Sequence, residues 1–298
     1  MIERAVVIAN PASRRGERLA ERARRELTER SIFCDLVFTE RPGHATELAL
    51  KNAPHYDAVF ALGGDGTVME VAGALAGTST PVGVLAGGTG NLLARALGIP
   101  LSIRKAIPAL VRGVQQVIDL GRFDSGRRFA MAAGVGIDAS MVAETPKWMK
   151  RRLGVAGYAL MGSLAAVRTV VRHDFFHARI LIDGRVHERD AAAVMVANFG
   201  AVLGNRITLG PEIRTNDGFL DVCVFSPRTL GDALRITRRL LSADFNGDPC
   251  LLYVRGRNVR VETTPPLQWQ ADGELMGKTP FSVVVEPLAV RLLVPPPP

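Results

Sequence analysis

The chain has 298 residues, 47% of them hydrophobic, enough to bury one large core or two of ordinary size. Its net charge of +8 favours anionic partners, but the low aromatic content of 6% and the lack of a nucleic-acid-binding motif argue against nucleic acid. Cys34, Cys223 and Cys250 lie far apart without metal-ligand spacing. This argues against disulfides or zinc and predicts a cytoplasmic protein.

Strand and helix patterns alternate over the first ~120 residues. Apolar strands are predicted at 5–9, 34–39, 58–62 and 82–85. Helices are predicted at 14–30, through residue 50, at 68–76 and from residue 91. This alternation predicts an α/β domain in which helices cover a parallel sheet in three layers.

Short strands dominate after residue 116. They are predicted at 116–120, 129–133, 178–182, 191–196, 220–225, 259–262, 267–271 and 281–286. Asp183-Gly184 predicts a hairpin, and helices are expected at 154–171 and 228–240. The pattern predicts a mainly β, antiparallel, sandwich-like second domain. We therefore expect residues 1–121, with a C-terminal strand at 289–298, to form one domain and 122–288 the other.

Two glycine turns carry the strongest chemical signal. Gly63-Gly64-Asp65-Gly66 and Gly87-Gly88-Thr89-Gly90 each follow an apolar strand and precede a helix. They therefore lie at the carboxyl edge of the predicted sheet, where α/β proteins bind ligands. Glycines let the backbone approach phosphate, and free N–H groups at a helix start favour anions. Asp65 suits Mg²⁺ or loop fixation; the plainer alternative is two tight turns with Asp65 as a helix cap.

Three other patterns do not fit their usual structural contexts. The stretch 273–279 resembles a Walker A loop but is one residue short and precedes a β-like run. The stretch 134–139 fits G-x-G-x-x-A, but it lies in the β-rich half without an acidic residue for a ribose. The apolar run at 153–171 is short for a membrane span and contains glycines, so a buried or interfacial helix is expected instead.

An ordered set of motifs resembles the diacylglycerol kinase catalytic-domain family, in its bacterial soluble branch related to sphingosine kinases. The matching segments are Asn10-Pro11-Ala12-Ser13, Thr39-Glu40-Arg41-Pro42-Gly43-His44-Ala45, Gly63-Gly64-Asp65-Gly66-Thr67 with Glu70, Gly88-Thr89-Gly90-Asn91, Gly136-Ile137-Asp138-Ala139, Asn216-Asp217-Gly218-Phe219-Leu220-Asp221 and Asp272-Gly273-Glu274. NAD kinases and phosphofructokinases carry loops similar to GGDGT, but the full ordered set is far more specific.

The resemblance implies ATP, Mg²⁺ and a lipid hydroxyl as reactants. It implies nucleotide-binding roles for Asn10, Thr39, Gly63, Gly64, Asp65, Gly66, Thr67, Val68, Met69, Gly88, Thr89 and Asn91. Glu274 would be the general base, with Asp65 and Asp272 organising Mg²⁺. A second, structural Mg²⁺ would use Asp217 with backbone oxygens of Arg214 and Phe219. Read without the resemblance, Asp272-Gly273-Glu274 is a hairpin turn.

Two positions depart from the family pattern. Met69 stands where the family usually has Asn, and Leu92 where it usually has Asp. Met cannot hydrogen-bond as Asn does, so details of nucleotide binding are expected to differ. Glu274, Asp65 and Asn91 are retained, and with them the expected chemistry.

A lipid substrate requires docking at a membrane. Lys147, Lys150, Arg151 and Arg152 precede the apolar helix at 154–171, an arrangement suited to peripheral contact with an anionic inner membrane surface; a solvated charge run before a core helix is the alternative. A homodimer is left open. Two other functions also remain: a soluble-substrate kinase of the NAD kinase type, and a nucleotide- or lipid-binding protein without turnover.

Overall fold

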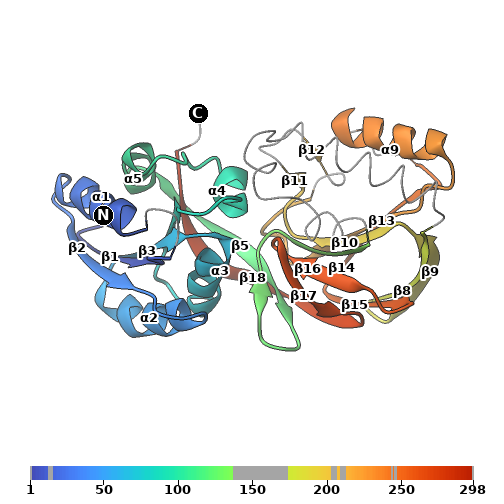
Figure 1. Ribbon diagram of the computed structural model, residues 1–298, viewed down its shortest axis with the longest axis horizontal. Coiled ribbons are helices and arrows are strands. Elements are labelled where there is room, and N and C mark those ends of the chain that lie inside the picture. Colours follow the sequence, from blue (N-terminus) through green and yellow to red (C-terminus); the bar gives the residue numbers. More distant parts are fainter. Residues whose placement is uncertain are drawn as a thin grey trace. The chain divides into compact units, whose positions relative to one another are not determined.

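The computed structural model describes residues 2–12, 16–136, 174–202, 207–208, 213–242, 244 and 247–296. The chain divides into two compact units (Figure 1). Unit 1 comprises Met1–Leu120 and Leu288–Pro298, and unit 2 comprises Gly121–Pro287.

Unit 1 contains a parallel sheet built from the predicted apolar strands. Its order is β2 (Phe33–Phe38), β1 (Arg4–Ala9), β3 (Ala58–Gly63), β4 (Val82–Ala86) and the last part of β18 (Phe281–Val294). Residues Leu292 and Leu293 of β18 pair with β4 in the parallel sense. β3 is buried along its whole length, as expected for a strand covered on both faces. β5 (Val114–Phe123) also pairs with β18.

Helices cover both faces of this sheet (Figure 1). α1 (Gly16–Thr28) and α5 (Ile103–Val111) pack together on one face, and α2 (His44–Asn52) and α3 (Asp65–Ala74) on the other. η1 (Ala53–His55) follows α2, and α4 (Leu92–Ala96) follows β4. α1 is strongly charged, yet it buries Ala20, Ala23 and Leu27 because their spacing places them on one face. The predicted three-layer α/β architecture is confirmed.

Unit 2 is an antiparallel sandwich. In one sheet, the first part of β18 pairs with β15 (Asn258–Thr264), followed by β8 (Phe176–Ile182) and β9 (Arg185–Ala191). The other has the order β14 (Leu251–Gly256), β13 (Leu220–Phe225), β10 (Ala193–Ala197), β7 (Ala132–Gly136), β16 (Gln268–Ala271) and β17 (Glu274–Lys278). β6 (Arg128–Phe129) pairs with β5, and β11 (Ala201–Val202) with β12 (Ile207–Thr208). α9 (Leu230–Ser242) is the helix of the described part of this unit.

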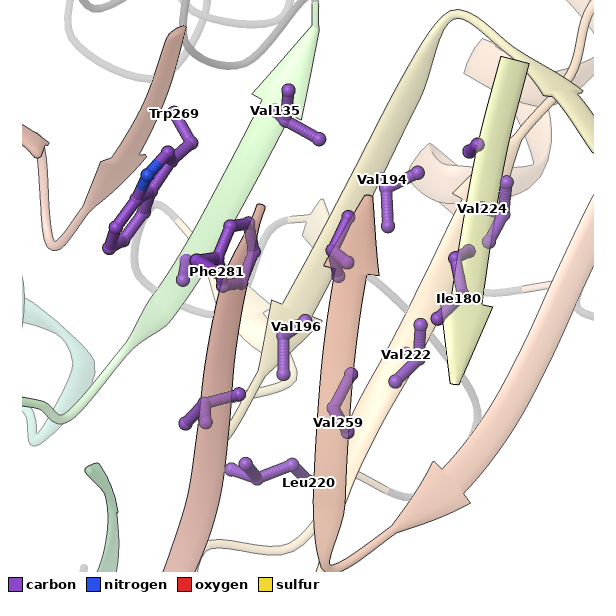
Figure 2. Packing of buried hydrophobic residues seen from close by; sticks show 14 of the residues in the cluster. Val135, Ile180, Val194, Val196, Leu220, Val222, Val224, Val259, Trp269 and Phe281 are labelled. Carbon is purple, nitrogen blue, oxygen red and sulfur yellow. The ribbon is translucent and has the colours of Figure 1, made fainter. Parts of the chain in front are cut away.

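The core of unit 2 lies between the two sheets (Figure 2). Alternation along β8 buries Phe176, Ala178, Ile180 and Ile182 and leaves the intervening residues more exposed. Trp269 of β16 stacks on Phe281 of β18, with ring centroids 4.5 Å apart, so the sandwich is closed by side chains from both sheets. The predicted antiparallel, sandwich-like domain is confirmed.

Several predicted boundaries were wrong for identifiable reasons. The strand expected at 129–133 is interrupted between β6 and β7, because Asp272 binds the N–H groups of Ala130, Met131 and Ala132. The helix expected from residue 68 begins at Asp65, with Gly64 at its N-cap. The hairpin at Asp183-Gly184 is confirmed between β8 and β9, both residues having positive φ.

Some predictions lie outside the described residues. These are Ser13, Ile137–Ala139 of the fifth motif, the basic run at 147–152 and the helix at 154–171. Within the part of the chain that is described, no helix is long and apolar enough to cross a membrane.

Candidate functional site

The carboxyl ends of four parallel strands meet at one edge of unit 1. Backbone hydrogen bonds run along this edge: Thr39 N–H donates to Ala9 O (2.9 Å), Asn10 N–H to Leu62 O (3.0 Å), and Gly87 N–H to Gly63 O (2.9 Å). The predicted nucleotide-binding residues after β1, β2, β3 and β4 are therefore brought together. This is the edge at which open α/β sheets bind ligands.

The two glycine turns touch through their backbones. A Cβ added to Gly88 would lie 2.5 Å from the Gly64 Cα, and one added to Gly87 would lie 3.1 Å from the Gly63 Cα. No other residue fits at Gly88 without moving the neighbouring turn. Glycine therefore serves turn–turn contact here, and its part in the approach of a phosphate stays a prediction.

Asp65 connects the turns at the start of α3. Its Oδ1 accepts the Leu92 N–H at 2.6 Å, and a Cβ on Gly90 would lie 2.6 Å from its Oδ2. A carboxylate at the first helical position also interacts favourably with the helix dipole. Asp65 thus fixes the second turn, which matches one of the two roles predicted for it. The other role, holding Mg²⁺, stays a prediction.

Asn91 closes the second turn on itself. Its Oδ1 accepts the Gly88 N–H and its Nδ2 donates to Gly88 O, each at 3.0 Å. Its backbone is left-handed, with φ of 49°, a conformation that Asn tolerates better than most residues. Because the Asn91 side chain is buried, it could influence a bound phosphate only indirectly, by holding the Gly88–Thr89 backbone in place.

The remaining predicted nucleotide residues differ in exposure. Asn10 Nδ2 donates to the Thr67 Oγ1 at 3.4 Å, and its Oδ1 accepts the Ala12 N–H at 3.0 Å. Val68 is only 4% exposed, so its side chain belongs to the core and it can offer only backbone to a ligand. Met69 and Gly66 are half-buried, and Thr89 is exposed on the second turn.

Glu70 was quoted within the signature motif but was not predicted to bind. Its carboxylate accepts the N–H groups of Gly43 (2.9 Å) and Ala45 (3.1 Å), which start α2. Glu70 thereby ties α3 to the segment after Thr39. Its position one helical turn after Gly66 is the sequence signal that could have indicated this role.

In unit 2, Asp272-Gly273 forms a hairpin turn, as predicted, but the strand that follows the turn is β17 rather than the expected strand at 281–286. Both residues have positive φ, 47° and 82°, as a two-residue type I′ turn requires. The Asp272 carboxylate accepts three backbone N–H groups, from Ala130 (2.8 Å), Met131 (2.9 Å) and Ala132 (3.1 Å). Gly273 N–H donates to Gln270 Oε1 at 2.8 Å. Asp272 is therefore a structural clamp that joins the β16–β17 turn to residues 130–132.

Glu274 directly follows this turn at the start of β17. Its side chain is 48% exposed, and its Oε2 accepts a hydrogen bond from Arg127 Nη2 at 2.9 Å. An exposed carboxylate on a rigid turn is suited to receive a proton from a substrate hydroxyl. The prediction that it acts on a nucleotide held by the glycine turns stays a prediction.

Asp217 and Phe219, two of the predicted metal ligands, lie in a polar cluster with Asp221 and Arg255. Asp217 Oδ1 accepts the Phe219 N–H at 3.1 Å, and Arg255 pairs with both Asp217 and Asp221. Asp221 Oδ2 is buried without a hydrogen-bond partner, and burial raises the pKa of Asp221 to about 6, with Arg255 opposing and Asp217 adding to the shift. The oxygen donors of this cluster suit Mg²⁺, and the Arg255 guanidinium is a cation that would compete with the ion for them. The described residues contain no cluster of three His, Cys, Asp or Glu that could hold a metal.

Family models match the two halves of the chain. Residues 4–123 match the diacylglycerol kinase catalytic domain, and residues 131–294 match the YegS C-terminal NAD kinase beta sandwich-like domain. A diacylglycerol kinase of Bacillus subtilis (strain 168) is 31% identical over 248 residues, covering 81% of this chain and 79% of the relative. The chain belongs to the diacylglycerol kinase family.

Other proteins similar to this diacylglycerol kinase family member include two curated relatives and one solved structure. A diacylglycerol kinase of Staphylococcus aureus (strain MRSA252) is 28% identical and covers 94% of this chain and 89% of the relative. A Synechocystis protein, sll0036, is 31% identical, and the chain spans 54% of its length. The crystal structure of a putative diacylglycerol kinase from Bacillus anthracis str. Sterne shares the fold, with a TM-score of 0.80, 24% identity and coverage of 98% and 97%. The homologues that carry this name indicate a kinase that phosphorylates an alcohol group.

Proposed function

We propose that this protein transfers the γ-phosphate of ATP to the hydroxyl of a lipid, diacylglycerol or a close relative. One observation carries the proposal: at a single strand edge, two glycine turns lie in backbone contact, one opening α3 and the other cross-linked to it by Asp65. Backbone N–H groups at such an edge bind phosphates without side chains. Membership of the diacylglycerol kinase family supports the lipid hydroxyl as acceptor.

The nucleotide would be held by residues around both turns. Gly63–Thr67 and Gly88–Thr89 offer backbone donors to the phosphates, while Asn10, Thr39 and Asn91 shape the edge around them. Val68 and Met69 lie in the first turns of α3, and we assign them backbone or packing contacts only. Most of the binding energy would then come from preorganised backbone rather than from flexible side chains.

Glu274 would serve as the general base. As the lipid oxygen bonds to the γ-phosphorus, its proton passes to the Glu274 carboxylate, the bond to the ADP oxygen breaks, and ADP leaves. The exposed carboxylate on a turn clamped by Asp272 supports this assignment. Asp272 would act by holding that turn in place.

Magnesium would act at two places. Mg²⁺ bound with ATP would neutralise charge on the phosphates, and Asp65, which lies within the first glycine turn, would orient it. A second ion would bind Asp217 with backbone oxygens of Arg214 and Phe219, in competition with Arg255. A rise in the unfolding temperature with Mg²⁺ alone, lost in Asp217→Asn, would support this second site; no rise in the wild type would remove it.

The lipid substrate also implies peripheral contact with an anionic membrane surface, for which the basic run at 147–152 supplies charge. The test of function is transfer of radiolabelled phosphate from ATP to a panel of diacylglycerol, phosphatidylglycerol, sphingosine and NAD. We expect label on a lipid. Label on NAD alone would establish the soluble-substrate alternative, and ATP binding without any product would establish the non-enzymatic one.

A further inference from the structure

Arg127 lies beside the proposed base. Its Nη2 donates to Glu274 Oε2 at 2.9 Å, and the two side chains are 58% and 48% exposed. An ion pair this exposed contributes little to folding, because water screens it and two long side chains lose rotational freedom. Stability alone therefore gives little reason for the pair.

The backbone on both sides of the pair is fixed. Arg127 lies in the β5–β6 hairpin, which is closed where Phe123 N–H donates to Arg127 O at 2.9 Å. The residues that follow, 130–132, are bound by the Asp272 carboxylate, and Asp272 N–H donates in return to Ala132 O at 3.0 Å. Asp272 thus joins the hairpin that carries Arg127 to the turn that carries Glu274.

We propose that Arg127 is a positioning residue for Glu274. Its guanidinium holds Oε2 so that the carboxylate keeps one orientation before the substrate arrives, and Oε1 is left to accept the hydroxyl proton. A base held in place loses less rotational freedom when the reaction occurs. This inference rests on the proposed function, because it assigns Arg127 a task only through Glu274 as the base.

The test compares Arg127→Gln, Arg127→Lys and the control Arg122→Gln. Arg122 belongs to the same hairpin and also pairs with a carboxylate, Glu286, with Nε and Oε1 2.7 Å apart. In a vesicle assay with diacylglycerol and radiolabelled ATP, we expect Arg127→Gln to lower kcat about ten-fold with KM for ATP unchanged. Arg127→Lys should recover most of the rate, and Arg122→Gln should keep it. The unfolding temperature of Arg127→Gln should match the wild type.

A double-mutant cycle with Glu274→Gln separates the possible outcomes. If Arg127 acts through Glu274, then Arg127→Gln has no further effect on the residual rate of Glu274→Gln. A ten-fold loss that recurs in that background overturns the inference, as does a normal kcat for Arg127→Gln beside a slow Glu274→Gln. Full activity of Glu274→Gln alone would instead remove the proposed base, a different failure.

Discussion

Each unit uses an aspartate to fasten one backbone segment to another, but the two aspartates do so differently. In unit 1, Asp65 accepts the N–H of Leu92 and lies within the turns that would hold phosphate. In unit 2, Asp272 accepts three N–H groups, two residues before the exposed Glu274. The contrast teaches that an acidic residue in a family motif can be structural, ligand-directed or both, and that substitutions can separate these roles.

The largest effect is expected from Asp65→Asn. An amide oxygen can still accept the Leu92 N–H, so the fold should survive, but the negative charge available to a phosphate-bound cation is lost. We expect kcat/KM for ATP to fall about 1000-fold with the unfolding temperature nearly unchanged. Near-normal turnover in this variant would show that Asp65 is only a loop fastener.

Asp272→Ala should act mainly on stability. It leaves three N–H groups without their charged acceptor, which should lower the free energy of unfolding by about 2–3 kcal/mol. Urea unfolding would measure this change. If stability held while turnover vanished, Asp272 would belong to the chemistry rather than to the clamp.

The contact between the glycine turns can be tested with a matched pair. In Gly88→Ala the new Cβ meets the Gly64 Cα at 2.5 Å, whereas in Gly64→Ala its nearest neighbour lies at 3.9 Å. We expect Gly88→Ala to cost about 1–2 kcal/mol of stability and Gly64→Ala less. Equal losses in thermal unfolding would contradict the observed closeness of the turns.

A third aspartate, Asp232 at the start of α9, belongs to neither of these turns and extends the comparison. Asp232 accepts the N–H groups of Arg228 and Thr229 at the start of α9 and pairs with Arg235. Burial alone would raise its pKa, but these partners lower the pKa to about 2. Because the folded-state pKa lies below the ordinary value, its contribution to stability is complete above about pH 4 and is lost as the pH falls towards 2.

Asp232→Asn should therefore cost about 1 kcal/mol at pH 7, and the difference from the wild type should shrink between pH 4 and 2. Activity should not change. Unfolding of both proteins across this pH range checks the prediction. A difference that stays constant with pH would mean that the charge of Asp232 contributes nothing.

Much of the fold could be predicted because its signals are local. Apolar runs such as 58–62 followed by glycine turns predicted the α/β unit. In unit 2, Asp183-Gly184 predicted the hairpin between β8 and β9. Strand β17 was not predicted, and β9 was implied only as the second arm of that hairpin, because both strands carry charged and polar residues without a clear apolar face. Their place in the sheets is set by pairing with β8 and β16 rather than by their own composition.

The site was less predictable, since its contacts join distant residues. The sequence pointed to Asp65 and Asp272, but the partners of these residues lie 27 and about 140 positions away. Arg127 gave no local signal at all, because only the folded hairpin places it beside Glu274. Backbone N–H groups, which supply most of the proposed phosphate contacts, are carried by every residue except proline and leave no side-chain signature.

The most direct measurement is phosphorylation of a lipid extract by Glu274→Gln beside the wild type and Glu188→Gln, an exposed carboxylate variant on β9. We expect Glu188→Gln to form phospholipid product at the wild-type rate, and Glu274→Gln to lose about 100-fold or more in rate while it still binds ATP. Product formed at full rate by Glu274→Gln would contradict the assignment of the base.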